Sequence, residues 1–206
     1  MNIHKITRIV FDNPAFYSCL MSILGSGEAM TRLVNDFIRP APGDRIFDFG
    51  CGPADIINYL PTGIEYVGFD FNEKCIDSAK MKYGNRGTFI LGNIADDSIP
   101  NCGQFDIVCA IGVLHHLPEK DAVKLIDDGV KLLKEGGRLI TLDNINEDYV
   151  GVVNKIALKL DRGAYIRNKD DYLKLFSKYN DIRCIIKKAP VRIPYYHITC
   201  ELIKRP

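Results

Sequence analysis

Two glycines stand one residue apart at the end of an apolar run, in the segment RIFDFGCGPADI (45–56). Glycines at the end of a strand let the backbone come close to a ligand. A dinucleotide-binding turn needs a third glycine where this chain has Asp55, whose carboxylate would repel a pyrophosphate by roughly 4 kcal/mol at about 4 Å and an effective dielectric of about 20. No Gly-Lys-Ser/Thr follows, which argues against a P-loop. Because Asp48 and Asp55 bracket the glycines, the turn favours a ligand with an ammonium and a sulfonium group over a phosphate.

Strands and helices alternate after this turn, which predicts a parallel sheet covered on both faces. The last two strands are joined by a short Pro-containing link, so they must pair antiparallel. We therefore predict an α/β fold with a doubly wound, mostly parallel seven-stranded Rossmann-like sheet and an antiparallel C-terminal hairpin. The first expected strand begins at Arg45. The other six are expected at 65–71, 87–93, 104–114, 138–144, 181–188 and 197–204.

Helix signals separate these strands. Asn72 and Gly84 are placed to begin and end one helix, whose buried stripe is Ile76, Ala79 and Tyr83. A second helix is expected to start at Pro118 and to stop at the Gly136-Gly137 pair, which leads into the fifth strand. Near the N-terminus, one helix face is predicted at Met30, Leu33, Val34, Phe37 and Ile38.

Composition places the chain among ordinary globular proteins. It has 206 residues, 47% of them hydrophobic, and a net charge of +1, so no global field attracts nucleic acid or a membrane. We find no apolar run of about 18 residues for a membrane span and no signal-peptide core. The seven cysteines form no CxxC pair, which predicts reduced thiols in a cytoplasmic protein and no metal site.

We expect a single domain with helices in 1–40, a cofactor-binding core in 41–145, and substrate-side helices and the hairpin in 146–206.

Five segments, in order, resemble the motifs of class I S-adenosylmethionine-dependent methyltransferases. FDFGCGPAD (47–55) resembles the first motif, with Ala54 in place of its last glycine. YVGFDFNEKCIDSAK (66–80), FILGNIADDSIP (89–100) and FDIVCAIGVLHHLPE (105–119) resemble the next three, and LLKEGGRLI (132–140) resembles the approach to the fifth strand. The resemblance implies S-adenosyl-L-methionine as cofactor and S-adenosyl-L-homocysteine as its product.

The resemblance also implies roles for the residues at the strand ends. Asp48 lies near the ammonium group of the cofactor, and Asp70 accepts hydrogen bonds from the ribose hydroxyls. The backbone around Gly50, Cys51 and Gly52 holds the methionine part of the cofactor, and Ala110 and Ile111 lie below the sulfonium. Phe71 packs on the adenine ring, whose edge is contacted by Asn93 and Ile94. Purely structural alternatives remain: a tight turn at the glycines, a helix-capping Asp70, a core position for Phe71, and a turn position for Asn93, where the family usually has an acid.

Methyl transfer to an oxygen needs a general base near the reacting methyl group. His115 and His116 follow the fourth strand at the mouth of the crevice, and histidine titrates near neutral pH. His116 is the stronger candidate for contact with the substrate. A histidine that only packs or caps the next helix is the alternative for each, because the VLHHL pattern is common in family members with different substrates.

Substrate recognition is expected after the fifth strand. Residues 155–192 hold 11 basic and four acidic residues, which indicates either an anionic acceptor, such as a nucleotide-sugar or a phospholipid-linked saccharide, or solvated helix faces. DRGAYIRNKDDYLKLF (161–176) and VRIPYYHITCELI (191–203) resemble the C-terminal part of bacterial methyltransferases associated with surface-polysaccharide gene clusters. That resemblance implies an acceptor pocket lined by Arg162, Tyr165, Arg167, Tyr195 and His197, with His197 a further catalytic candidate. The segment from Ala15 to Leu24 could act as a lid or pack at the sheet edge.

We predict methyl transfer from S-adenosylmethionine to a small-molecule or carrier-linked acceptor, with a sugar hydroxyl as the expected group. One alternative is a cofactor-binding module that has lost catalysis. The other is a nucleotide-dependent dehydrogenase or epimerase, against which stand Asp55 and the lack of a Tyr-x-x-x-Lys pair. Nucleic acid is not expected as acceptor, since the chain has neither a basic-aromatic binding module nor an Asn-Pro-Pro-Tyr motif after the fourth strand.

Overall fold

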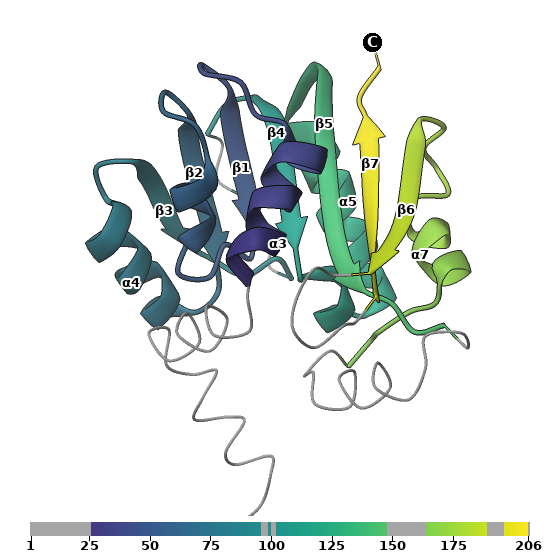
Figure 1. The fold of residues 1–206 in the computed structure, drawn as a ribbon. Coiled ribbons are helices and arrows are strands. Elements are labelled where there is room, and N and C mark those ends of the chain that lie inside the picture. Colours follow the sequence, from purple (N-terminus) through teal and green to yellow (C-terminus); the bar gives the residue numbers. More distant parts are fainter. Residues whose placement is uncertain (1–25, 96–98, 100–101, 148–163, 189–195, 206) are drawn as a thin grey trace, which may run out of the picture.

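The computed structural model describes residues 26–95, 99, 102–147, 164–188 and 196–205. In this part of the chain, seven strands form one sheet in the order β3-β2-β1-β4-β5-β7-β6 (Figure 1). Strands β1 to β5 are parallel, and β7 pairs antiparallel with both β5 and β6. The predicted α/β fold with its antiparallel C-terminal hairpin is confirmed. The strands are β1 (Arg45–Phe49), β2 (Glu65–Asp70), β3 (Gly87–Leu91), β4 (Phe105–Ile111), β5 (Leu133–Asn144), β6 (Ile182–Lys188) and β7 (Tyr196–Ile203).

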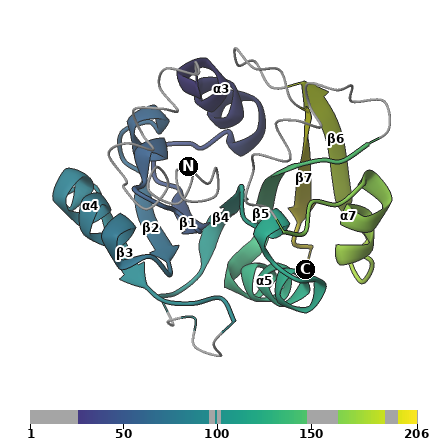
Figure 2. The same cartoon turned by 90° about the horizontal axis from the view of Figure 1, so that it is seen from below.

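Helices cover both faces of the sheet (Figure 2). One face carries α3 (Ser26–Arg32), the π-helical turn η1 (Leu33–Ile38), the short 3₁₀ turn η2 (Asp55–Tyr59) and α4 (Glu73–Tyr83). The other face carries α5 (Glu119–Leu132) and α7 (Lys169–Leu175). Because side chains alternate along a strand, Phe47 and Phe49 of β1 pack toward α5, while Ile46 and Asp48 point to the α4 face. The first strand therefore carries a carboxylate into a buried layer.

The predicted helix after β2 forms as expected. The side chain of Asn72 accepts hydrogen bonds from the backbone N–H groups of Lys74 and Cys75, which caps α4. Ile76, Ala79 and Tyr83 are its buried residues, as predicted. The predicted N-terminal helix face also packs inward, but its second half, η1, is π-helical and ends at Arg39 in a left-handed conformation.

The predicted strand at 138–144 lies within β5, but the prediction that Gly136-Gly137 ends the preceding helix is wrong. Helix α5 stops at Leu132, and β5 begins at Leu133 and runs through both glycines. The register explains the difference: Phe105 pairs with Leu133 but Ile107 pairs with Arg138, so β5 inserts extra residues at an irregularity. Gly136, with φ of +76°, supplies the left-handed backbone that this irregularity needs.

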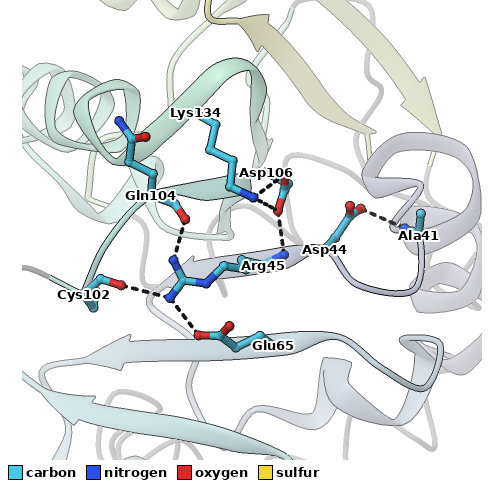
Figure 3. A network of polar contacts seen from close by, with 8 residues as sticks. All are labelled: Ala41, Asp44, Arg45, Glu65, Cys102, Gln104, Asp106 and Lys134. Carbon is cyan, nitrogen blue, oxygen red and sulfur yellow. Dashed lines mark hydrogen bonds and ion pairs between the residues drawn. The ribbon is translucent and has the colours of Figure 1, made fainter.

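A polar network joins the starts of the strands at the amino edge of the sheet (Figure 3). The Arg45 guanidinium donates to the carbonyls of Cys102 and Gln104 at 3.0 and 2.6 Å and pairs with Glu65 at 2.7 Å. Asp106 accepts from the Arg45 backbone N–H at 2.9 Å and from Lys134 at 2.8 Å. These contacts tie β1, β2, β4 and β5 together at the edge opposite the glycine turn.

Two cysteines of the hairpin form a disulfide, so the prediction that all thiols are reduced is wrong for this pair. Cys184 of β6 is bonded to Cys200 of β7, and their Cα atoms are 4.1 Å apart. The antiparallel register places these two residues directly opposite each other, which a sequence separation of 16 does not reveal. Among the described residues, Cys51, Cys75, Cys102 and Cys109 are free thiols.

No helix in the described ranges is both long and apolar enough to span a membrane. Likewise, the described side chains include no cluster of three or more histidine, cysteine or acidic residues placed to hold a metal ion. The proposed lid segment from Ala15 to Leu24 lies outside the described residues.

Candidate functional site

The carboxyl ends of β1, β2, β4 and β5 meet at one edge of the sheet, which faces the viewer in Figure 2. In an open parallel sheet, ligands bind beyond this edge, where the strand order reverses. The reversal lies between β1 and β4, since β2 and β3 continue from β1 on one side and β5 follows β4 on the other. The glycine turn after β1 and the two histidines after β4 flank this point.

The glycine turn is fixed to the end of β2 by backbone hydrogen bonds. Gly50 N–H and Cys51 N–H both donate to the Phe69 carbonyl, at 2.7 and 3.2 Å. Gly50, Gly52 and Ala54 have φ values of +66°, +53° and +57°. A left-handed alanine is strained by roughly 1 kcal/mol, which gives a physical reason for the glycine that the family motif has at this position.

The two glycines differ in what surrounds them. A Cβ atom on Gly50 would lie 2.6 Å from Cγ2 of Val113, so only hydrogen fits there. A Cβ on Gly52 would meet no atom within 4 Å. Gly52 therefore borders open space at the sheet edge, and Gly50 is needed for the packing of the turn against the segment after β4.

Asp70, the last residue of β2, is only 7% exposed and uses both carboxylate oxygens. Its Oδ2 accepts from Gly52 N–H and its Oδ1 from Asn72 N–H, each at 2.8 Å. Burial raises the pKa of Asp70, and these backbone donors oppose the rise. An ionised carboxylate has about four lone-pair sites, so Asp70 holds the turn in place and keeps acceptor capacity toward a ligand.

Asp48 is buried on the α4 face of β1 with an exposed fraction of 4%. The Tyr66 hydroxyl donates to its Oδ2 at 2.6 Å. Burial raises the pKa of Asp48 to about 7, against the opposing effect of the Tyr66 hydrogen bond. The carboxylate therefore changes charge near neutral pH, and a cation beside it would favour the ionised form. Tyr66, which sets this environment, was not identified from the sequence.

Phe71 is 77% exposed, which rules out the core position considered as its structural alternative. An exposed apolar ring directly after the end of β2 is available for stacking. Asn93 accepts a hydrogen bond from Ala95 N–H at 3.0 Å, so it occupies a turn.

The remaining predicted cofactor contacts differ in burial. Ile94 is partly buried, Ala110 is fully buried, and Ile111 ends β4 at the carboxyl edge of the sheet.

Asp55 is turned away from the glycine edge. Its Oδ1 pairs with the Lys82 ammonium at 3.1 Å and accepts from the Tyr83 hydroxyl at 3.2 Å, both on α4. The electrostatic argument against a pyrophosphate is therefore weaker than the sequence indicates, because Lys82 neutralises this charge.

The two adjacent histidines after β4 lie in different environments. His115 is 4% exposed, whereas His116 is exposed. The Nδ1 of His115 lies 2.8 Å from Oδ1 of Asp143, and the His115 backbone N–H donates to the same oxygen at 3.1 Å. The structure therefore favours His115 over His116 as the oriented imidazole.

Asp143 was not identified as a site residue from the sequence. The only available signal was an acid at the end of the fifth strand, which parallel topology brings to the same edge as His115. Asp143 is 1% exposed, and among the described residues no group hydrogen-bonds to its Oδ2. In the tautomer in which Nδ1 of His115 donates to Oδ1 of Asp143, the imidazole carries its lone pair on Nε2.

His197 lies in the sheet near the same edge, opposite Asn144 of β5 and Lys187 of β6. It is 7% exposed, and burial, together with the Lys187 charge, lowers its pKa to about 4. Such an imidazole is a weak proton acceptor compared with a base matched to neutral pH.

Beside the histidine segment lies a cleft of about 910 Å³, between the end of β5 and the start of α7. Tyr165, which is 45% exposed, and Arg167 are among its lining residues, and their contact with an acceptor stays a prediction. Arg162 and Tyr195 lie outside the described residues. The other lining residues, which the sequence did not single out, are Glu119, Asn146, Glu147, Ile166, Asn168, Lys169, Asp170, Asp171 and Lys174.

Comparison with known proteins agrees with this geometry. Residues 47–141 match the family model of a methyltransferase domain. A 27-O-demethylrifamycin SV methyltransferase of Amycolatopsis mediterranei is 30% identical over 54% of this chain and 44% of its own length. A ubiquinone biosynthesis O-methyltransferase of Vibrio parahaemolyticus is 27% identical over 47% of this chain and 42% of its own. The chain thus spans less than half the length of these curated relatives.

Among solved structures, the magnesium protoporphyrin IX methyltransferase of Synechocystis PCC 6803 with bound SAH is similar to this chain. The two share 25% identity with a TM-score of 0.63, over 87% of this chain and 82% of that one. A SAM-dependent methyltransferase from Methanosarcina mazei has a TM-score of 0.67 at 16% identity, over 84% of this chain and 97% of that one, and so shows the shared fold.

Proposed function

We propose that this chain, which belongs to the class I S-adenosylmethionine-dependent methyltransferases, transfers a methyl group to a hydroxyl oxygen of a small or carrier-linked acceptor. The observation that carries the proposal is the buried His115–Asp143 pair at the carboxyl edge of the sheet, 2.8 Å between Nδ1 and Oδ1. An oriented imidazole at this place suits removal of a hydroxyl proton.

The residues at the edge fit the cofactor. The open space over Gly52 admits a ligand, the carboxylate of Asp70 can accept from a ribose diol, and the exposed ring of Phe71 can stack on a base. Asp48 is buried in β1, two residues before Gly50, and its carboxylate can balance an ammonium group. When bound, S-adenosylmethionine supplies an electrophilic methyl group on a sulfonium sulfur.

His115 is the general base in this proposal. Its Nε2 would take the proton of the acceptor hydroxyl, so that the oxygen could bond to the methyl carbon that S-adenosylmethionine would supply, with the carbon–sulfur electron pair left on sulfur. The products are a methyl ether, S-adenosylhomocysteine and a protonated imidazole, which returns its proton to solvent. Asp143 holds the ring in the required tautomer and stabilises the imidazolium form.

Two observations support an oxygen acceptor on an uncharged polar molecule, with a sugar hydroxyl as the specific proposal. The curated relatives include named O-methyltransferases, among them the ubiquinone biosynthesis enzyme of Vibrio parahaemolyticus. The cleft beside the histidines has a mixed lining, in which four acidic residues face three basic ones: Glu119, Glu147, Asp170 and Asp171 against Arg167, Lys169 and Lys174. Because positive charge is not in excess among the described lining residues, these residues do not support the anionic acceptor that residues 155–192 suggested.

The test is methyl transfer from labelled S-adenosylmethionine to a panel of sugar, phenol and carboxylate acceptors. We expect His115→Gln and Asp143→Asn to lower transfer at least about 100-fold while the affinity for S-adenosylhomocysteine, measured by calorimetry, stays within about twofold. His116→Gln is the matched control and should keep most of the activity. Loss of transfer in His116→Gln with a fully active His115→Gln would reject the assignment of the base. Tight S-adenosylhomocysteine binding, weakened by Asp70→Ala, with no transfer to any acceptor would indicate a binding module instead.

A further inference from the structure

The His115–Asp143 pair joins two separate pieces of backbone. His115 lies in the 3₁₀ turn η3 (Leu114–His116) after β4, and Asp143 lies at the end of β5. A hydrogen bond between them forms only if the turn and the strand end keep a fixed relative position. The question is which residue outside the pair maintains that position.

The side chain of Arg167 holds the histidine turn. Its Nη1 donates to the Leu114 carbonyl and its Nη2 to the Leu117 carbonyl, each at 2.7 Å. These two carbonyls belong to the residues on either side of His115 and His116. In addition, the Tyr165 N–H donates to the His115 carbonyl at 3.0 Å. The segment 165–167 thus fixes the peptide that carries the proposed base at three carbonyls.

The backbone of Arg167 holds the other partner. Arg167 forms a parallel β-bridge with Ile145, and its carbonyl accepts from Asn146 N–H at 3.0 Å. Ile145 and Asn146 directly follow the end of β5, two and three residues after Asp143. Arg167 therefore binds the histidine turn through its side chain and the segment after β5 through its main chain.

We propose that Arg167 is a positioning residue that sets the geometry of the His115–Asp143 pair. Its contacts with Leu114, Leu117, Ile145 and Asn146 are called the Arg167 clamp below. The role deepens the proposed function and replaces the acceptor contact that the sequence assigned to Arg167, since the guanidinium is committed to backbone carbonyls. A planar guanidinium can hold two carbonyls in a fixed orientation, which the single ammonium of a lysine cannot do.

Displacement of a catalytic group by about 1 Å can lower a rate about 100-fold, so such a clamp matters to the chemistry without touching the substrate. It also connects the base to the cleft, because Tyr165 and Arg167 form part of the cleft wall.

The experiment is proton and nitrogen NMR of histidine-labelled full-length protein, with S-adenosylhomocysteine present. The hydrogen-bonded Nδ1 proton of His115 should give a solvent-shielded downfield resonance, assigned by its absence from His115→Gln. In Arg167→Met we expect this resonance to disappear or to exchange with solvent at least about tenfold faster. In Arg167→Lys, which keeps a single donor nitrogen, we expect partial retention of the resonance with faster exchange.

Arg138→Met is the matched control. Arg138 also donates from its guanidinium to two backbone carbonyls, those of Phe37 and Ile38 at 3.2 and 2.6 Å, but in the α3–η1 layer, away from the histidine turn. It should lower overall stability and leave the His115 resonance unchanged. An unchanged resonance in Arg167→Met, or an equal loss in Arg138→Met, overturns the proposal. If Arg167→Met does not fold, Arg167→Lys decides: exchange at the wild-type rate overturns the clamp.

The NMR measurement needs no methyl acceptor. It therefore tests the Arg167 clamp independently of the proposed function. A wild-type protein whose His115 resonance depends on Arg167, but which methylates nothing, would refute the function and keep the clamp. Methyl transfer that needs His115 but is indifferent to Arg167→Met would refute the clamp and keep the function.

Discussion

The cofactor side and the acceptor side of this site are built by different means. On the cofactor side, the turn at 50–54 is held by its own backbone N–H groups, which donate to the Phe69 carbonyl and to the Asp70 carboxylate. On the acceptor side, side chains make the contacts: the Arg167 guanidinium reaches the Leu114 carbonyl, 53 residues away, and a disulfide ties β6 to β7. The first construction depends on backbone conformation and tolerates few residue types. The second depends on individual side chains, which can vary while the fold persists.

The largest expected effect comes from the glycine turn. Gly50→Ala places a Cβ 2.6 Å from Val113 Cγ2 in a left-handed backbone, so we expect loss of several kcal/mol of stability or failure to fold. Gly52→Ala meets no atom and should cost only about 1 kcal/mol, but its methyl group fills the ligand space and should weaken S-adenosylhomocysteine binding at least about tenfold.

Thermal unfolding and calorimetric titration of both variants check this contrast. The double variant Gly50→Ala with Val113→Ala should recover part of the stability, because it removes the clashing side chain. Equal destabilisation by the two single substitutions would contradict the difference between packing and ligand space.

On the acceptor side, reduction of the Cys184–Cys200 disulfide should lower the free energy of unfolding by about 3 kcal/mol, from a loop of 16 residues. Affinity for S-adenosylhomocysteine should stay within about twofold, because β4 and β5 separate β6 and β7 from β1 in the sheet. Denaturant unfolding with and without dithiothreitol measures the loss. Cys184→Ala is the control and should be insensitive to the reductant.

A smaller effect is expected from His197, whose pKa is lowered to about 4 in the folded protein from an ordinary 6.5. The unfolded chain therefore binds more protons between these values, so stability is present above about pH 6.5 and falls as the pH drops toward 4. Between pH 7 and pH 5 we expect a loss of about 2 kcal/mol. Urea unfolding at both pH values should show a smaller loss of unfolding free energy in His197→Asn. An identical loss in wild type and variant would contradict the assignment to His197.

The smallest effect should appear at Asp48, on the cofactor side. Its pKa of about 7 leaves it mostly protonated at pH 6 and mostly ionised at pH 8. Because the ionised form attracts an ammonium group, affinity for S-adenosylhomocysteine should rise by up to about tenfold from pH 6 to pH 8. Calorimetry across this range tests it, and Asp48→Asn should bind with little pH dependence. A variant that keeps the full wild-type slope would assign the titration to another group.

Much of the cofactor side could be read from the sequence because its signals are local. The Gly50–Gly52 spacing, the acid at Asp70 and the cap at Asn72 each lie within a few residues of the element they shape, so strand ends and turn chemistry follow directly. Even so, burial of Asp48 against Tyr66 and the outward position of Phe71 depended on which face of the sheet each strand residue occupies.

The acceptor side could not be read in this way. Tertiary structure alone paired His115 with Asp143, turned the guanidinium of Arg167 onto the carbonyls of Leu114 and Leu117, and placed Cys184 opposite Cys200. In the sequence, each of these residues matches ordinary alternatives: a packed histidine, a solvated arginine, a reduced thiol. Their partners are fixed by strand order and register, which set distances between residues far apart in the chain. The sequence by itself determined the fold class and the cofactor turn, and the register of β5, β6 and β7 decided which side chains meet at the site.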